Sequence, residues 1–203
     1  MRLAILISFA AFGLSFFAAR ADESLIKVTL DAGPAYIVPE SYATAHKSEL
    51  VASIPGPVKI DGFWTPTEVD VIVAERVFRE LIHSAVKDPT LLFPDLAPST
   101  DPAVPADLAV AAQLENERYE LTLVSSNYDR YSRQYVGIII DGQQLVFCNY
   151  ADVPKVDPST GYIFIDQVFV ADGSVHFLQC RFDPMEKTCS NVSMIGSWQR
   201  SAK

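Results

Sequence analysis

The chain has 203 residues, with 16 Lys and Arg against 25 Asp and Glu, which gives a formal net charge of −9 at pH 7. Because 49% of the residues are hydrophobic, the composition excludes a chain that is disordered throughout. The acidic excess repels phosphate backbones and anionic lipids, so we expect neither nucleic-acid binding nor membrane-surface binding.

The first 21 residues have the pattern of a cleavable signal peptide. Arg2 supplies a short positive region, and residues 3–17 form an uninterrupted run of apolar and small residues. Ala19-Arg20-Ala21 then fits the small-x-small pattern that precedes a cleavage site. A retained membrane anchor is the alternative, but it needs about 20 apolar residues and this run is shorter. We therefore expect an exported protein, periplasmic or extracellular, without membrane attachment after residues 1–21 are removed.

Residues 22–60 are predicted to form an extended arm with little regular structure. Residues 25–30 have the composition of a short strand, but prolines at positions 34, 39, 55 and 57 interrupt the rest. Residues 61–203 then have the length and composition of a single globular domain.

A helix start is the clearest local signal in the chain. Thr65 is predicted as the N-cap, Pro66 as the first helical residue, and Glu68 as the acid that completes a capping box. Apolar residues then recur at steps of three and four to about residue 86, while Glu75 and other charged residues take the opposite side. This spacing predicts one long amphipathic helix with one buried face.

The second half of the chain is predicted to be mostly strands. A proline-rich connector over residues 88–106 leads to a short helix at 105–117, and from about Tyr119 the hydrophobic period changes to two. Strands at 135–140 and 144–150 flank an Asp-Gly turn, and further strands are expected at 162–170, 175–182 and 189–195. The fold class predicted is α+β: one long helix on a curved antiparallel meander of four to five strands.

Several motifs occur in a fixed order over residues 61–198: FWTPTEVDV, YSRQYVG, an Asp-Gly hairpin ending in FCN, VADGS, FDP and SNVSM. In this order they resemble a group of exported bacterial proteins of unknown activity, whose arrangement is similar to the cystatin-like α+β fold. The resemblance implies the domain, the fold and the compartment. It assigns no functional residue.

The segment around Arg133, Gln134 and Tyr135 is the candidate binding surface, because an Arg with Gln and Tyr neighbours suits a carboxylate or a peptide edge. The alternative is that Arg133 pairs with an acid such as Asp166 or Asp172 and braces the sheet. Trp64 is similarly interpreted as packing at the helix start rather than as a ligand platform.

The sequence predicts no metal site and no cofactor. None of His46, His83 and His176 lies at ligand spacing with another His or with a Cys. A G-x-S-x-G elbow, a glycine-rich phosphate loop and an H-E-x-x-H motif are all missing from the sequence, so no catalytic set is recognisable.

Three cysteines, Cys148, Cys180 and Cys189, allow one disulfide in an oxidising compartment. Strand alternation predicts that Cys180 faces the core and that Cys189 lies on the opposite face, which disfavours pairing of these two. A Cys148–Cys180 disulfide is the preferred pairing, and three unpaired thiols remain an equal alternative.

Two functions are therefore weighed. The first is a non-catalytic binding or interaction module with a protein or peptide partner, which the missing catalytic set favours. The second is an enzyme or small-ligand carrier with a pocket between helix and sheet, lined by Tyr135, Trp64, Asn149 and His176. A fold by itself does not choose between them.

Overall fold

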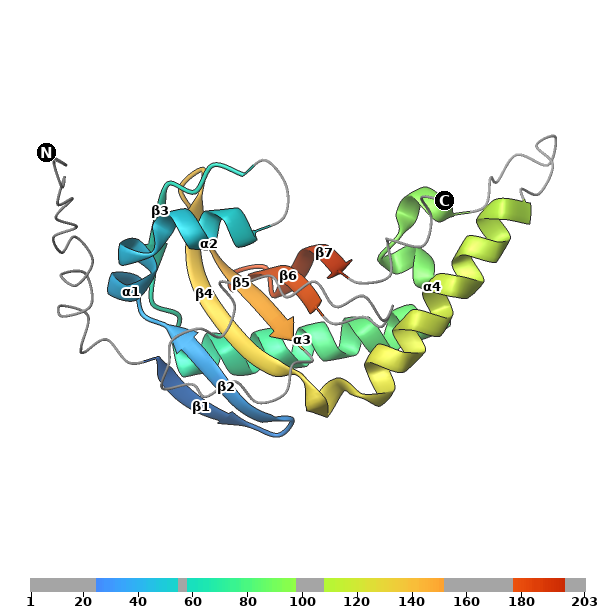
Figure 1. The fold of residues 1–203 in the computed structure, drawn as a ribbon, viewed down its shortest axis with the longest axis horizontal. Coiled ribbons are helices and arrows are strands. Elements are labelled where there is room, and N and C mark those ends of the chain that lie inside the picture. Colours follow the sequence, from blue (N-terminus) through green and yellow to red (C-terminus); the bar gives the residue numbers. More distant parts are fainter. Residues whose placement is uncertain (1–24, 55–57, 98–107, 152–176, 196–203) are drawn as a thin grey trace, which may run out of the picture.

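The computed structural model describes residues 25–54, 58–97, 108–151 and 177–195. Within these ranges seven strands form one mixed sheet (Figure 1). Six of them follow the order β1-β2-β4-β5-β6-β7, and the seventh, β3, pairs with β4 on the same edge as β2. The strands are β1 (Ile26–Leu30), β2 (Gly33–Val38), β3 (Gly62–Trp64), β4 (Ser132–Ile140), β5 (Gln143–Ala151), β6 (Phe177–Asp183) and β7 (Thr188–Ile195). The α+β class is confirmed, and the sheet is larger than predicted.

The helices lie on both sides of this sheet. They are α1 (Glu40–Ala45), α2 (Lys47–Ser53), α3 (Glu68–Lys87) and α4 (Leu108–Ser126), with 3-10 turns η1 (Pro89–Leu91), η2 (Pro94–Leu96) and η3 (Tyr128–Arg130). Helix α3 packs on one face through Val71, Phe78 and Ile82, which join a core with strand residues such as Cys148 and Tyr150. Helices α1 and α2 cover part of the other face, where Leu50 and Ile54 join a second core.

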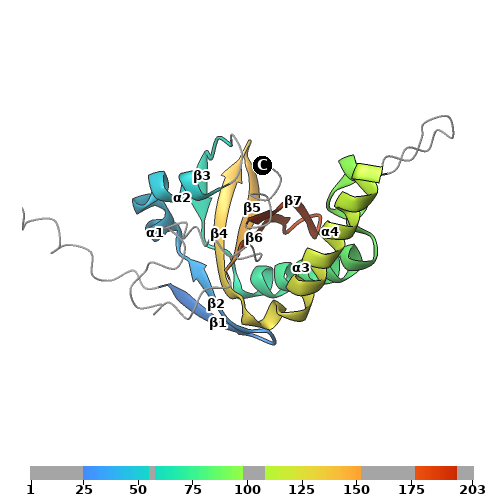
Figure 2. The ribbon, with the colours of Figure 1, turned by 45° about the vertical axis from the view of Figure 1, so that its right-hand side comes forward.

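The prediction of a single long helix was wrong, because α4 is nearly as long as α3. The sequence interpretation ended the second helix at residue 117 and began a strand period near Tyr119. In the structure Glu117, Leu121 and Val124 are buried at steps of four and three, which is the helical period. Figure 2 shows α4 crossing the end of α3 and projecting away from the sheet.

The prediction of an extended arm before residue 60 was also wrong for the described residues. Strand β1 agrees with the expected strand, but β2, α1 and α2 follow it, and β2 pairs in parallel with β4. The parallel pairing makes the sheet mixed rather than an antiparallel meander. Pro39 does not interrupt this order, because it is the N-cap of α1, where a missing N–H leaves no intrahelical bond unmade.

The start of α3 is displaced by two residues from the prediction. Thr67, not Thr65, is the N-cap: its Oγ1 accepts a hydrogen bond from the Asp70 N–H at 3.2 Å, and the Asp70 Oδ2 accepts one from the Thr67 N–H at 2.9 Å. The sequence holds two overlapping Thr-x-x-acid patterns, and β3 keeps the chain extended to Trp64. Thr65 accepts a hydrogen bond from the Glu40 N–H instead, at the start of α1.

The Asp-Gly hairpin is confirmed. Residues of β4 and β5 pair from Ser132↔Ala151 to Ile140↔Gln143, and Asp141 and Gly142 have φ of 50° and 77°, as a type I′ turn requires. The turn after β6 is also confirmed, since the Asp183 Oδ1 accepts hydrogen bonds from the Met185 and Glu186 N–H groups. The predicted strand at 162–170 and the turn at Asp172-Gly173 lie outside the described residues.

Gly137 permits the close approach of β3 to β4. It pairs with Trp64, and a Cβ added to Gly137 would lie 2.2 Å from the Trp64 carbonyl oxygen and 2.8 Å from two Trp64 ring carbons. No ordinary side-chain shift relieves a clash with backbone, so β3 would have to move away from β4.

We therefore expect Gly137→Ala to lower the free energy of unfolding by about 2 kcal/mol or more, as overpacking of a rigid site does. Gly62→Ala is the matched control in the same strand pair, because its added Cβ would meet only Ile139 at 3.4 Å. Urea unfolding of both variants measures the difference. Equal stability of the two variants would contradict this account of Gly137.

Candidate functional site

Arg133 lies at the centre of a buried polar cluster between α3 and the sheet. Its side chain is 1% exposed, and its Nε donates to the Glu75 Oε1 of α3 at 2.9 Å. Its Nη1 donates to the carbonyl oxygens of Ala32 and Tyr131, and its Nη2 to that of Tyr128 at 2.7 Å. One guanidinium thus joins α3, β4, the β1–β2 turn and the link between α4 and β4.

Aromatic side chains fill the space around this ion pair. The Tyr135 hydroxyl donates to the second oxygen of Glu75 at 2.7 Å, so both carboxylate oxygens are hydrogen-bonded. The guanidinium carbon of Arg133 lies 5.1 Å from the ring centre of Tyr128. The rings of Phe78 and Tyr150 stack with centres 4.8 Å apart. Side chains from α3 and the sheet therefore occupy the place where a ligand pocket was considered.

The electrostatics of the cluster suit bracing rather than proton transfer. Burial raises the pKa of Tyr128, Tyr135 and Tyr150 above the usual range, and the Glu75 carboxylate contributes in the same direction. These phenols therefore stay protonated at neutral pH. The hydroxyls of Tyr128 and Tyr150 have no hydrogen-bond partner in the described structure, which leaves two buried polar atoms beside the ion pair.

The predicted binding residues do not converge on one place. Arg133 and Tyr135 face α3, whereas Gln134 and Asn149 face the opposite side of the sheet, because side chains alternate along a strand. Trp64 is half-buried, and its Nε1 donates to the Leu145 carbonyl oxygen at 3.0 Å, which ties β3 to β5. His176 lies outside the described residues.

Gln134 and Asn149 belong instead to a row of polar side chains across three strands. Gln134 pairs with Asn149, and Asn149 with Gln179 of β6, and all three residues are 4% exposed. The Gln179 Nε2 donates to the Asn149 Oδ1 at 3.1 Å, and the Ser193 Oγ of β7 donates to the Gln179 Oε1 at 3.4 Å. The side chains are therefore hydrogen-bonded to one another from β5 to β7, and Gln134 lies beside Asn149 at the β4 end of the row.

The cysteines are three free thiols, and one part of the sequence prediction about them was wrong. Cys148 and Cys180 are opposite each other on β5 and β6, as the preferred pairing requires. Cys189, however, faces the same side as Cys180, and their sulfur atoms lie 3.8 Å apart. A register shift between Gln179 and Arg181 reverses the alternation that was used to place Cys189 on the other face.

Sequence reasoning missed Glu75, which was assigned to the polar side of α3 because of its charge. The spacing itself contained the signal. Val71, Glu75, Phe78 and Ile82 follow each other at steps of four, three and four, and all are buried. The spacing therefore places Glu75 on the buried side of α3. It does not predict that Arg133 is the partner of Glu75.

Two further acids are buried on α4. Glu117 and Glu120 are 5% and 4% exposed, and one carboxylate oxygen of each has no hydrogen-bond partner. Burial raises the pKa of Glu117, and the neighbouring charge of Glu120 raises it further. Ionised Glu117 therefore destabilises the folded state.

The outward face of α4 carries exposed apolar side chains, which are Leu108 at 83%, Tyr119 at 62% and Leu123 at 37%. They follow each other at steps of 11 and 4, which places them on one side of a helix of 3.6 residues per turn. Leu121 and Val124 on the other side are buried. We call Leu108, Tyr119 and Leu123 the outer face of α4.

We expect Arg133→Ala to lower the free energy of unfolding by about 3–5 kcal/mol, because it leaves the buried Glu75 carboxylate unpaired. Arg76→Ala, an exposed change one residue from Glu75, should cost at most about 0.5 kcal/mol. Chemical denaturation measures both. A melting temperature for Arg133→Ala close to that of the wild type would contradict this bracing role.

Glu117→Gln is expected to stabilise the protein at about pH 7 and to have little effect at about pH 4. The raised pKa means that the folded state holds the Glu117 proton more tightly than the unfolded state does. Stability from this group is therefore full at low pH and falls as the pH rises through the two pKa values. Melting temperatures across this range test the sign, with the exposed Glu80→Gln on α3 as the control. A stabilisation that does not change with pH would contradict the assignment.

Other kinds of site find no support in the described ranges. There, no three His, Cys, Asp or Glu side chains are grouped so as to hold a metal ion, and no helix is long and apolar enough to cross a membrane. Comparison with known proteins found no matching family model, no similar curated protein and no similar solved structure.

Proposed function

We propose that this chain is an exported, non-catalytic interaction module that binds a protein partner through the outer face of α4. The observation that carries the proposal is the alignment of Leu108, Tyr119 and Leu123 on one exposed side of a projecting helix. Single exposed apolar residues are ordinary, but an aligned set on one element is typical of contact surfaces.

The chemistry of this face suits a protein contact. Tyr is enriched among the residues that dominate interface energies, and a rim of polar groups around an apolar centre is the usual arrangement. The ion pair between Arg118 and Glu115 lies on the same helix and supplies such polar neighbours. An amphipathic or apolar surface of a partner protein is therefore the proposed ligand.

A non-catalytic role agrees with the use of the polar groups inside the molecule. Arg133, Glu75 and Tyr135 bond to one another, and Gln179 bonds to Asn149 and Ser193. These groups have their hydrogen-bonding capacity engaged internally. The proposed likeness to the cystatin-like arrangement points the same way, since domains of that kind commonly act by protein contact.

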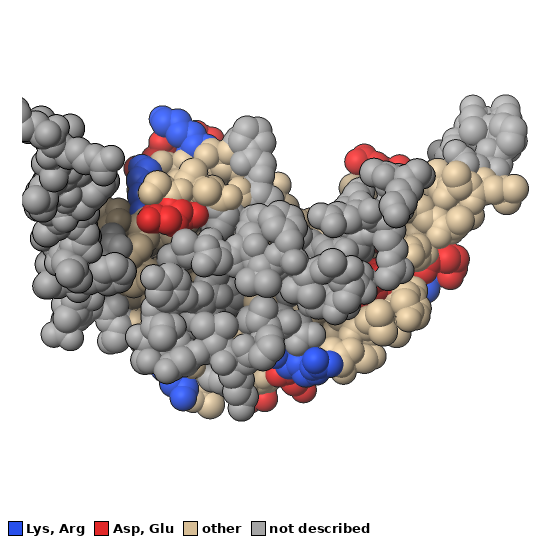
Figure 3. Space-filling view, in the orientation of Figure 1, with Lys and Arg blue, Asp and Glu red and all other residues tan. Residues whose placement is uncertain are grey.

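The proposed partner is neither a nucleic acid nor a lipid surface. The net charge of −9 opposes both. On the face drawn in Figure 3, the described Lys and Arg side chains form small separate groups, most of them beside acidic ones, rather than a continuous patch. The proposed compartment is outside the cytoplasm, which the apolar run and the Ala-Arg-Ala pattern of residues 1–21 support.

The test compares three immobilised proteins in a pull-down from periplasmic extract. We expect the wild type to retain a partner protein that the variant Tyr119→Ser/Leu123→Ser loses. The control is Val69→Ser/Ile72→Ser, which removes a more exposed apolar pair from α3 and should retain the partner. Unchanged melting temperatures establish that both variants fold.

A partner that both variants lose, or that both retain, would contradict the assignment of the surface to α4. No specific partner with the wild type would contradict the proposed function itself. Light scattering on the purified wild type tests whether the partner is a second copy of this chain.

A further inference from the structure

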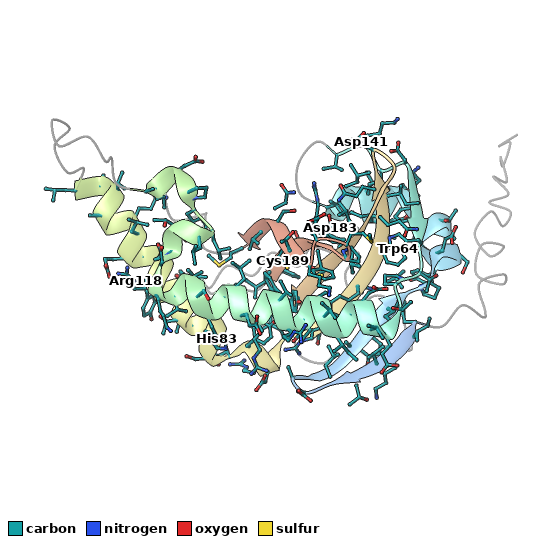
Figure 4. The ribbon with its side chains drawn as sticks, turned by 180° about the vertical axis from the view of Figure 1, so that it is seen from behind. Trp64, His83, Arg118, Asp141, Asp183 and Cys189 are labelled. Carbon is teal, nitrogen blue, oxygen red and sulfur yellow. The ribbon has the colours of Figure 1, made fainter. Side chains whose placement is uncertain are left out.

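Three thiols lie on one face of three consecutive strands. Cys148 of β5 is directly opposite Cys180 of β6, and Cys189 of β7 comes next on the same side, facing α3. Cys148 and Cys180 are fully buried, whereas Cys189 is only partly buried. The row therefore runs from the core to β7, the edge strand of the described sheet, whose Cys189 is labelled in Figure 4.

A β-bulge in β7 brings Cys189 to this face. Phe182 pairs with Cys189 and Arg181 with Ser190, but Gln179 pairs with Ser193, so Asn191 and Val192 together oppose Cys180. The extra residue shifts the alternation by one, and Asn191 takes the positive φ of 49° that accommodates it. Cys189 and Met194 consequently both face the core, although an unbulged strand would place them on opposite sides.

We propose that Cys180 and Cys189 are a disulfide-forming pair, oxidised by exchange with a disulfide oxidant in the compartment to which the chain is exported. Their sulfur atoms are 3.8 Å apart across the β6–β7 hairpin. Side-chain rotation must close this distance to about 2.0 Å, the length of the bond. This pairing replaces Cys148–Cys180, and it does not depend on the outer face of α4.

The exchange starts at Cys189, because this thiol is the one with exposed surface. Its thiolate attacks a sulfur of the oxidant RSSR, which releases one RS⁻ and leaves a mixed disulfide on Cys189. Cys180, after losing its proton, then attacks the Cys189 sulfur and displaces the second RS⁻. The two thiols are oxidised to one disulfide, RSSR is reduced to two RSH, and the two protons from the protein pass to the released thiolates.

Cys148 stays outside this exchange. Its Sγ donates a weak hydrogen bond to the Val146 carbonyl oxygen at 3.6 Å, and an oxidant cannot reach it in the folded protein. Burial also raises the pKa of the Cys148 thiol, which keeps it protonated. Burial raises the pKa of the Cys180 thiol as well, which agrees with an exchange that starts at Cys189 rather than at Cys180.

The bond would fix the last strand of the described sheet to its neighbour. Cys180 and Cys189 bracket the turn formed by Asp183 and the following residues, so the closed loop is short. The stabilisation expected from closing a short loop is smaller than that from a long one. The expected gain in melting temperature is therefore a few degrees.

Oxidised glutathione is the probe, added to the purified and reduced folded protein. Thiols are counted after denaturation, and a non-reducing tryptic digest locates the bond. The three cysteines lie on different tryptic peptides, which are residues 134–155, 156–181 and 188–200. We expect one thiol to remain and peptide 156–181 to be joined to peptide 188–200. A bond between 134–155 and 156–181, three remaining thiols, or glutathione left on Cys189 would each overturn the proposal.

Two variants separate the proposed pair from the alternative. Cys148→Ser should oxidise at the wild-type rate and lose both remaining thiols. Cys189→Ser, which changes only a partly buried residue, should retain its two thiols, with oxidation slower by about tenfold or more because the accessible thiol is missing. Equal oxidation rates for Cys189→Ser and the wild type would overturn the proposal.

Discussion

The buried ion pair between Arg133 and Glu75 joins α3 to the sheet, to the β1–β2 turn and to the segment before β4. Two buried charges are costly to remove from water, and the cost is offset only where each charge has full hydrogen bonding. Here both carboxylate oxygens and three guanidinium nitrogens are bonded. Because the acceptors lie on α3, in the β1–β2 turn and before β4, these bonds constrain how the elements meet.

This constraint also bears on function. An arginine beside three tyrosines has the composition of a binding cluster, yet its side chains face one another in a filled core. The charged groups of Arg133 and Glu75 and the hydroxyl of Tyr135 are hydrogen-bonded inside the protein. The amide side chains of Asn149 and Gln179, on the other face of the sheet, are bonded to each other. What stays available is at the periphery: the outer face of α4 and the partly buried thiol of Cys189.

Much of the local structure was predictable from the residues. The Asp-Gly turn, the strands on either side of it, the turn at Asp183 and the stripe of α3 all follow from short-range stereochemistry and hydrophobic spacing. The errors came where two local solutions compete. Overlapping Thr-x-x-acid patterns permit two starts for α3. The apolar residues near Tyr119 fit the period of a strand as well as that of a helix, and the structure places Leu121 and Val124 on the buried side of a helix.

The sequence by itself determined the acidic charge, the apolar run of residues 3–17, the main hairpin and the approximate extent of α3, because these depend on neighbouring residues. Tertiary structure alone decided the parallel pairing of β2 with β4, the partner of Arg133 and the face of Cys189. The reason is physical: Arg133 and Glu75 are 58 residues apart in the chain. A single extra residue in β7 moves the side chains beyond it to the opposite face of the sheet. The alternation of residues within one strand predicts neither this bulge nor a partner so far away in the chain.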